Sequence, residues 1–324
     1  MTGREGKTVP FDQAAPGRFE VATPTIAYAG IGDEAGVNLM TQLEALDRLG
    51  WNWIELRCVD GTAIADLNDE AFNQLVDALA ARGVNVAGVA SRIGNWSRPI
   101  TGAFEQDLDE LAILNRRCVT LGTRYIRVMS YLNAGLDERE WGRQAVYRLR
   151  ELASRAEQAD LFLLHENCTG WAGTSAQRML ALLDAVGSPA LRLLFDTGNG
   201  VAYGYDAYAM LADIVTHVAH VHVKDAAGTP AKPVYTLPGA GQARVADCLR
   251  LLVQTGYTGA WSIEPHLTLR PHDCLVINGH QNENGLARFD SFVASGRALE
   301  QLVSDQVVPA FATSTAVPGG LVYG

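Results

Sequence analysis

Apolar and polar positions alternate in blocks along most of the chain. Short apolar runs rich in Val, Ile and aromatic residues are separated by longer stretches in which apolar residues recur at spacings of three and four. The short runs are typical of buried parallel strands, and the longer stretches of amphipathic helices. The eight predicted strands are 25–28, 53–57, 84–90, 125–129, 161–166, 191–196, 219–224 and 260–264. The helix-periodic stretches include 38–49, 69–82, 105–121, 138–159, 175–186 and 245–255.

The repeated alternation of strand and helix, with no linker between halves, predicts a single α/β domain, a (β/α)₈ TIM barrel. The alternative is an open doubly wound sheet. A Gly-rich nucleotide-binding motif after the first strand would favour that alternative, and the sequence has none there, so we expect no nucleotide cofactor. We expect a lead at 1–22, the barrel at 23–305 and a tail at 306–324 that packs on a neighbouring subunit or frays.

Composition and charge narrow the function. The chain has 324 residues, of which 48% are hydrophobic, enough for a large core, and its net charge of −10 disfavours nucleic acid and anionic membranes as partners. Five widely spaced cysteines without a CxxC pair indicate a reducing compartment rather than a disulfide framework. The amino terminus has no apolar signal segment, and no apolar run is long enough to span a membrane. We therefore expect a cytoplasmic protein.

Metal-ligand residue types end four consecutive predicted strands, the fifth to the eighth. They are Glu166 in LLHEN, Asp196 in LLFDTGN, His222 in VHVKD and Glu264 in SIEPH. Such groups are costly to bury unless they are paired or bind a metal, and the carboxyl ends of barrel strands form the catalytic face. Three carboxylates and one imidazole suit one divalent ion; we expect Mn²⁺, with Mg²⁺ or Co²⁺ as alternatives. The preceding residues of these strands should face the helices; three are apolar, and the exception is His165.

Two further candidates for acid–base chemistry follow the predicted ligands. Lys224 and His266 stand two residues past His222 and Glu264, so each should share the inward facing of the ligand before it. Either could move a proton or stabilise a developing oxyanion. The ordinary alternatives are a surface pair of Lys224 with Asp225 and a loop histidine.

Candidate substrate contacts come from the loops at the same face. Asn199 follows the predicted ligand on the sixth strand and could bind a hydroxyl, and Trp171 could stack on a sugar ring rather than pack within its loop. Arg57, Arg92 and Glu55 fall near the ends of strands two and three. The sequence gives no reason to prefer one of these three as a pocket residue, and we take Arg92 as a candidate substrate contact. Long loops at 226–243 and 266–284 should shape the pocket.

The motifs HEN, FDTGN, HVHVKD and SIEPH resemble the sugar isomerase/epimerase superfamily of xylose-isomerase-like TIM barrels, roughly over 25–303. That superfamily includes ketose 3-epimerases, inosose dehydratases and isomerases, dehydroshikimate dehydratases, C-glycoside deglycosidase subunits and a DNA-repair endonuclease branch. The resemblance implies that Glu166, Asp196, His222 and Glu264 bind the metal. It further implies that the two glutamates act as acid and base on opposite faces of the substrate, and that the protein is a homo-oligomer.

Departures from the family pattern bear on the reaction. The ketose 3-epimerases of the superfamily that this chain resembles usually carry a His and an Arg at the positions of Asn199 and Gly228. Endonuclease members need additional histidine and carboxylate ligands and a basic DNA groove, which the seven histidines and the net negative charge of this chain do not support. A non-catalytic sugar-binding barrel would not need all four ligands. We expect a metal-dependent isomerase or epimerase that removes the proton α to a keto-sugar carbonyl. The alternative is a lyase on the same site, either an inosose-type dehydratase or a C-glycoside deglycosidase catalytic subunit acting on 3-keto glycosides with a small partner subunit.

Overall fold

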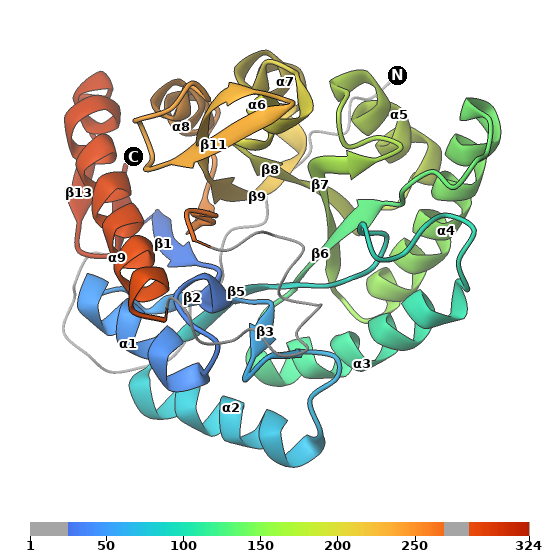
Figure 1. Cartoon of the computed structure of the whole chain (residues 1–324), viewed down its shortest axis with the longest axis horizontal. Coiled ribbons are helices and arrows are strands. Elements are labelled where there is room, and N and C mark those ends of the chain that lie inside the picture. Colours follow the sequence, from blue (N-terminus) through green and yellow to red (C-terminus); the bar gives the residue numbers. More distant parts are fainter. Residues whose placement is uncertain (1–24, 269–284, 324) are drawn as a thin grey trace.

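The chain folds into a ring of parallel strands surrounded by helices (Figure 1). A computed structural model describes residues 25–268 and 285–323. Neighbouring strands pair in the order β1-β12-β9-β8-β7-β6-β5-β2, and a parallel bridge between Ile31 and Glu55 joins the two ends of this series. The predicted TIM barrel is therefore confirmed. The barrel strands are β1 (Ile26–Gly30), β2 (Trp53–Leu56), β5 (Asn85–Ala90), β6 (Tyr125–Ser130), β7 (Phe162–Gly170), β8 (Leu191–Asp196), β9 (Val218–Val223) and β12 (Gly259–Ile263).

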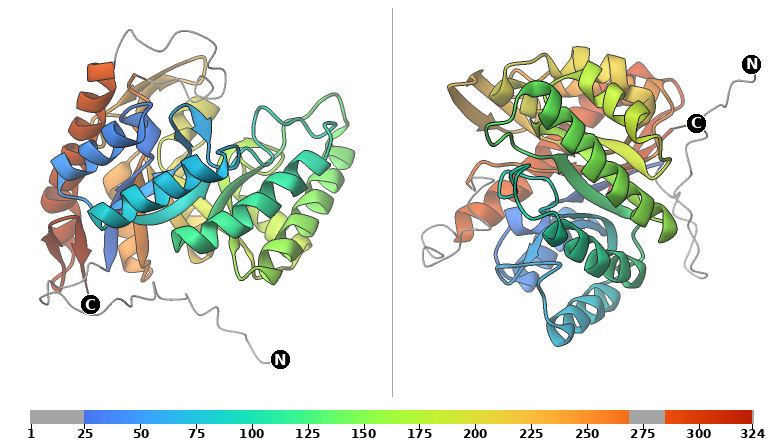
Figure 2. Two further views of the ribbon diagram at one scale, coloured as in Figure 1. Left: turned by 90° about the horizontal axis from the view of Figure 1, so that it is seen from below. Right: turned by 90° about the vertical axis from the view of Figure 1, so that its right-hand side faces the viewer.

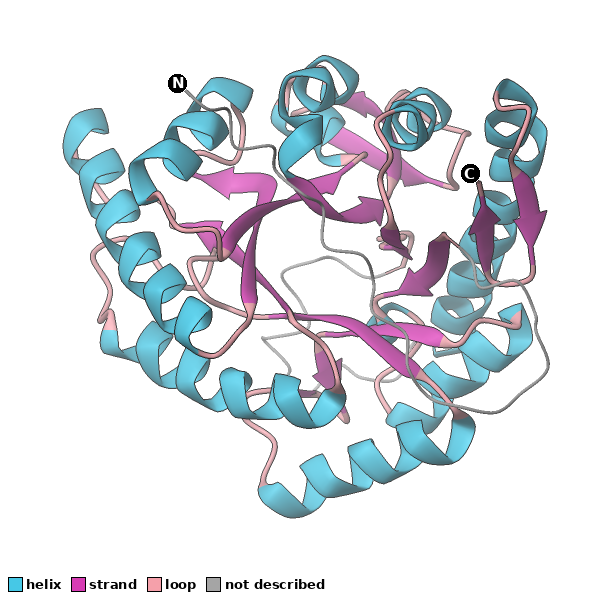
Figure 3. Ribbon diagram, turned by 180° about the vertical axis from the view of Figure 1, so that it is seen from behind, coloured by secondary structure: helices cyan, strands magenta, loops and turns pink. Residues whose placement is uncertain are grey.

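The helices cover the outside of the barrel (Figure 3). Six occupy the predicted stretches: α1 (Leu39–Leu49), α2 (Asp69–Arg82), α3 (Glu105–Leu121), α4 (Glu138–Gln158), α5 (Ala176–Val186) and α8 (Val245–Gln254). Three more lie between β8 and β9 or after β12: α6 (Asn199–Tyr203), α7 (Ala207–Ile214) and α9 (Gly285–Leu302). In the part of the chain that the structure describes, no helix is long and apolar enough to cross a membrane.

Capping residues explain why the helix limits were readable. At the start of α2, the Asn68 side chain accepts a hydrogen bond from Ala71 N, and at its end Gly83 adopts a left-handed conformation with φ of 64°. An asparagine oxygen satisfies one of the free N–H groups of the first turn, and glycine takes the left-handed conformation without a Cβ clash. These local signals do not depend on the rest of the fold, so they can be read from sequence.

The main core lies between the strands and the helices. Phe195, Val221 and Ile263, three of the residues expected to face outward, are buried there with Leu43 and Leu46 of α1. Full burial of each such side chain contributes roughly 1.5–3 kcal/mol. This packing leaves the alternate strand positions for the barrel interior, which is where the charged residues lie.

Within residues 25–268 and 285–323, three antiparallel hairpins supplement the barrel. Two follow barrel strands: β3 (Cys58–Val59) with β4 (Thr62–Ala63), and β10 (Asp225–Thr229) with β11 (Lys232–Thr236) within the long loop predicted at 226–243. The third, β13 (Thr315–Val317) with β14 (Gly320–Val322), belongs to the tail, and β14 pairs with β1 (Figure 2).

Part of the tail pairs with the barrel of its own chain rather than fraying, and its packing on a neighbouring subunit stays a prediction. Leu321 and Gly320 pair with Ile26 and Ala27, while the β1–β2 bridge lies beyond the other end of β1. An unpaired strand edge leaves backbone N–H and C=O groups without partners, and β14 satisfies them along this edge. The predicted lead at 1–22 and most of the predicted loop at 266–284 lie outside the described residues.

Candidate metal centre

The structure brings the four predicted ligands together. Glu166 lies in β7, Asp196 ends β8, His222 lies in β9 and Glu264 directly follows β12. One ligand atom from each of the four lies within 4.8 Å of the others, and all four residues are buried. Because the strands are parallel neighbours, one strand-end residue from each converges on the same side of the barrel interior.

His222 faces this group through one ring nitrogen. Its Nδ1 lies 3.4 Å from Glu264 Oε2, 3.8 Å from Glu166 Oε1 and 4.0 Å from Asp196 Oδ2. Among the described residues this buried Nδ1 has no hydrogen-bond partner. A buried nitrogen that faces three carboxylates without a partner of its own is what a divalent cation between them would satisfy, so the residues present fit a metal ion.

Arginines hold the two glutamates from outside the cluster. Arg127 Nη1 donates to Glu166 Oε2 at 2.9 Å, and Arg57 Nη1 donates to Glu264 Oε1 at 3.0 Å. Burial would raise the pKa of Glu166, but Arg127 and His222 lower it to about 2. Burial acts likewise on Glu264, and Lys224 and His266 bring its pKa well below the usual range. Both glutamates are therefore ionised at neutral pH.

Asp196 behaves differently. Burial raises its pKa to about 6, and the nearby Lys224 ammonium opposes the rise without cancelling it. The other oxygen of its carboxylate, Oδ1, accepts hydrogen bonds from the backbone N–H groups of Gly198 and Asn199, both at 2.8 Å. These bonds fix the carboxylate at the end of β8.

Lys224 lies inside the centre. Its Nζ is 2.8 Å from Asp196 Oδ2 and 2.9 Å from Glu264 Oε2, and its side chain is 2% exposed. Burial would lower the pKa of the amine, but Asp196 and Glu264 raise it well above the usual value. The surface pair with Asp225 does not form, because that carboxylate accepts the backbone N–H groups of Gly239, Gly241 and Ala243.

His266 adjoins the centre through Glu264. Its Nε2 lies 3.6 Å from Glu264 Oε1, while its Nδ1 lies 2.9 Å from Glu34 Oε1. Its φ of 50° places a non-glycine residue in the left-handed region, and its ring packs edge to face with the Tyr235 ring, with the ring centroids 5.1 Å apart. Strained backbone of this kind persists only where surrounding contacts hold it, and it is common at functional sites.

The predicted substrate contacts separate into two groups. Asn199 joins the centre, because its Nδ2 donates to Glu166 Oε1 at 3.2 Å. Trp171 instead packs on Gly142 of α4, where an added Cβ would lie 2.6 Å from the indole, and Arg92 pairs with Asp66 and Glu110 at 2.6 and 3.1 Å. Within the described residues, the contacts of Trp171 and Arg92 do not join them to the four ligands, so their substrate role stays a prediction.

Sequence reasoning missed part of the site. Arg127 of β6 was not singled out, and Glu55 and Arg57 were noted without a role, yet all three are buried and contact the predicted ligands. The available signal was the position of each charged residue in or beside a short apolar strand, where an unpaired charge is too costly to bury. Their partners, however, are distant in sequence.

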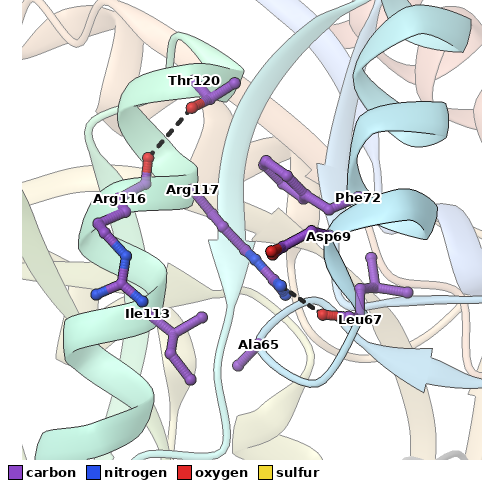
Figure 4. Close-up of a pocket in the computed structure, with 8 residues that line it drawn as sticks. All are labelled: Ala65, Leu67, Asp69, Phe72, Ile113, Arg116, Arg117 and Thr120. Carbon is purple, nitrogen blue, oxygen red and sulfur yellow. Dashed lines mark hydrogen bonds between the residues drawn. The ribbon is translucent and has the colours of Figure 1, made fainter.

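A separate pocket lies outside the barrel between α2 and α3 (Figure 4). Arg117 and Phe72 are among the residues that line it, and the Arg117 guanidinium packs 4.8 Å from the centre of the Phe72 ring. Arg117 also donates to the carbonyl oxygens of Ile64 and Leu67. These bonds anchor the segment between β4 and α2, so the arginine has a structural role there.

The fold and the cluster of carboxylates and a histidine at the strand ends define a TIM barrel with a candidate metal site. Sequence comparison is more specific. The chain belongs to the family of xylose isomerase-like TIM barrels, whose profile matches residues 43–280. The predicted family resemblance is therefore confirmed.

Individual relatives include two kinds of enzyme. A 2-epi-5-epi-valiolone 7-phosphate 2-epimerase from Actinoplanes is 33% identical over 60% of this chain and 67% of its own length. An inosose dehydratase from Clostridium perfringens is 26% identical over 40% of this chain, which spans about half, 48%, of that enzyme. Among solved structures, the IOLI protein with a bound zinc atom superimposes with a TM-score of 0.64 at 16% identity, over 86% of this chain and 99% of that protein. Relatives of this chain thus act as epimerases and dehydratases.

Proposed function

We propose that this protein is a divalent-metal-dependent isomerase or epimerase of polyhydroxylated ketones that removes the proton on the carbon next to the carbonyl. The observation that carries the proposal is the matched arrangement of Glu166 and Glu264. Each gives one oxygen to an arginine, Arg127 or Arg57, and turns the other toward His222 Nδ1. Two ionised carboxylates that face one centre from different strands suit proton removal and return.

The four residues Glu166, Asp196, His222 and Glu264 would hold the ion, for which we favour Mn²⁺, with Mg²⁺ or Co²⁺ as alternatives. When bound, a divalent ion supplies Lewis acidity that lowers the cost of negative charge on a carbonyl oxygen of the substrate. The zinc in the IOLI protein supports a metal in this fold.

The side chains of the chain then divide the remaining work. A glutamate of low pKa is a weak base, so it can remove the α-hydrogen only when that hydrogen has been made more acidic. The nearby arginine keeps the glutamate aligned for this transfer. Proton transfer makes that glutamate a carboxylic acid, which returns the proton in an isomerisation. Epimerisation needs a proton on the opposite face. Because both glutamates start ionised, the second glutamate first takes that proton from solvent, and the first glutamate gives its own proton up to solvent before the next turnover. Lys224 stands between Asp196 and Glu264 to donate a hydrogen bond to a developing oxyanion.

The substrate class rests on the relatives. The compounds in the two relatives' names, a valiolone phosphate and an inosose, are both cyclic polyhydroxy ketones. We propose the same chemical class for this chain. A homo-oligomer and a partner subunit stay predictions.

A second candidate, a lyase, is favoured by one specific feature. The Lys224 ammonium is buried and charged beside Glu264, so it could protonate a departing hydroxyl β to the carbonyl after the α-proton has left. The similarity to an inosose dehydratase supports this candidate. Both reactions begin with removal of the α-proton. In the isomerase or epimerase a proton then returns to carbon, whereas in the lyase the β-hydroxyl leaves.

One experiment tests the first step and separates the outcomes. Catalytic amounts of Mn²⁺-loaded protein are incubated in D₂O with ketohexoses, inososes and 3-keto glycosides, beside EDTA-treated protein and Glu166→Gln. We expect metal-dependent deuterium uptake next to the carbonyl in proton NMR spectra, with the sugar recovered as itself or its isomer. Loss of water or of an aglycone would transfer the protein to the lyases. Equal signals with and without metal, or none with any substrate, would contradict the proposal.

A further inference from the structure

A second buried cluster adjoins the four ligands and is not part of the predicted set. Glu55 Oε2 lies 2.8 Å from His220 Nε2, and Glu55 Oε1 lies 3.0 Å from His222 Nε2. The three side chains are at most 2% exposed. His222 thus belongs to both clusters: its Nε2 faces Glu55 and its Nδ1 faces the three ligand carboxylates.

The contact crosses the barrel interior. His220 and His222 stand two residues apart on β9, so both point inward, whereas Glu55 comes from β2, which is separated from β9 by β12 and β1 in the barrel. The two imidazole rings meet edge to face, with centroids 5.6 Å apart and an interplanar angle of 87°. Ser262 Oγ of β12 lies 3.2 Å from His220 Nε2. His220 and Glu55 are therefore held by contacts from β2, β9 and β12.

The hydrogen bond decides which nitrogen of His222 can bind a cation. A neutral imidazole carries one proton, and the nitrogen without it supplies the lone pair for a metal. A carboxylate beside Nε2 accepts a hydrogen bond from the N–H of that nitrogen, so the proton stays on Nε2 and the lone pair is on Nδ1. Metal-binding histidines are commonly oriented by such an outer carboxylate.

We infer that Glu55 is a positioning residue for the metal centre: it holds the proton of His222 on Nε2, so that Nδ1 binds the ion, and His220 holds Glu55 in place. This inference rests on the proposed function only for the presence of an ion among the four ligands. The competing arrangement is an ion held by Glu55, His220 and His222 through Nε2, since these three also offer ligand atoms within 4.8 Å of one another.

The first test determines which ring nitrogen of His222 carries the proton and which binds the metal. The protein is labelled with ¹⁵N in its histidines and loaded with diamagnetic Zn²⁺, and the His222 signals are assigned by comparison with His222→Gln. We expect a proton on Nε2 and the metal-bound signal on Nδ1. A proton on Nδ1, or a metal-bound Nε2, would overturn the inference without any variant of Glu55 being needed.

The second test measures metal affinity. Metal-free wild-type protein, Glu55→Gln and Glu300→Gln are titrated with Mn²⁺, and the free ion is followed by electron paramagnetic resonance. Glu300 serves as the matched control because it accepts a hydrogen bond from Trp51 Nε1 and is not among the residues of either cluster. We expect Glu55→Gln to bind Mn²⁺ about 10- to 100-fold more weakly and Glu300→Gln to bind it like the wild type.

The outcomes separate this inference from the proposed function. If wild-type protein binds no divalent ion, the proposed function fails, and the inference fails with it. If wild-type protein binds the ion and a folded Glu55→Gln binds it equally well, only the role of Glu55 is overturned. Circular dichroism and thermal melting establish that the variant is folded; if it is not, the ring measurement on wild-type protein decides.

Discussion

Arg57 and Glu264 are joined across 207 residues of sequence by a buried ion pair, with Nη1 of the arginine 3.0 Å from Oε1 of the glutamate. The same guanidinium reaches Asp33 at 3.0 Å and Glu34 at 2.8 Å. One cation from the end of β2 therefore compensates three carboxylates, including a candidate metal ligand and the carboxylate that holds His266.

Removal of this cation should destabilise the fold. Arg57→Met leaves Asp33, Glu34 and Glu264 buried without their shared partner, and breaking a buried pair on one side costs about 3–5 kcal/mol. Urea unfolding at pH 7.5 measures the change in the free energy of unfolding. The control is Arg155→Met, which removes an exposed pair with Glu151 and should change it by about 0.5 kcal/mol or less. Equal effects of the two substitutions would contradict this account of Arg57.

The two glutamates of the centre should be required for turnover and not for folding. Glu166→Gln and Glu264→Gln keep the shape of each side chain and still offer an oxygen to Arg127 or Arg57, but they cannot accept the substrate proton. We expect deuterium exchange to become undetectable in both variants while the circular dichroism spectrum is kept. Glu138→Gln, at an exposed position on α4, is the control. Exchange at the wild-type rate in either glutamate variant would remove that residue from the mechanism.

Lys224 should affect turnover more than metal binding. Its ammonium contacts the carboxylates of Asp196 and Glu264, so its removal takes away a positive charge that competes with a cation for the same oxygens. For Lys224→Met we expect deuterium exchange to fall by about 10²- to 10⁴-fold and Mn²⁺ affinity to be equal or higher. Rates come from NMR and affinities from Mn²⁺ titration. A large loss of Mn²⁺ affinity with an unchanged rate per bound ion would contradict the assigned role.

His165 should make stability depend on pH. The ring is fully buried on β7, and among the described residues neither ring nitrogen has a hydrogen-bond partner. Burial lowers its pKa from 6.5 to about 4, against the raising effect of Glu166. The folded state therefore binds fewer protons than the unfolded chain between these values, so the contribution of His165 is complete above pH 6.5 and is lost as the pH falls toward 4.

The magnitude can be measured by comparison with a variant. A depression of this size corresponds to about 3 kcal/mol between pH 7.5 and pH 4. Urea unfolding across this range should show that much less pH dependence in His165→Leu than in the wild type. His217→Leu is the comparison: burial also lowers the pKa of His217, but this ring is only half-buried, so the pH dependence should fall by less than in His165→Leu. A His165→Leu curve parallel to that of the wild type would show that the ring is not buried in its neutral form.

Much of the fold could be predicted because its signals are local. The helices followed from the spacing of their apolar residues, and the strands from their apolar runs. The four candidate ligands could be grouped because each ends a strand and the barrel topology places the strand ends together. Both predictions needed only the periodicity of apolar residues and the rule that the carboxyl ends of barrel strands lie together at one face.

The remaining contacts depend on which side chains meet across the barrel. Glu55 contacts His222 across 167 positions of sequence, and Arg127 contacts Glu166 from the neighbouring strand. The spacing of these residues in the sequence predicts neither contact. Trp171 packs on α4, where the glycine at position 142 makes room for the indole, and this contact also has no signal in the sequence; its stacking on a sugar stays a prediction. The pairing of β14 with β1 likewise joins residues from the two ends of the described chain.

A divalent ion among Glu166, Asp196, His222 and Glu264 is the central requirement of the proposed function. Anomalous X-ray diffraction from crystals soaked in Mn²⁺ locates that ion directly, without knowledge of the substrate. We expect one strong peak bounded by the three carboxylates and by His222 Nδ1, absent from crystals of Asp196→Asn. No peak in wild-type crystals, or a peak between Glu55, His220 and the Nε2 side of His222, would contradict this requirement.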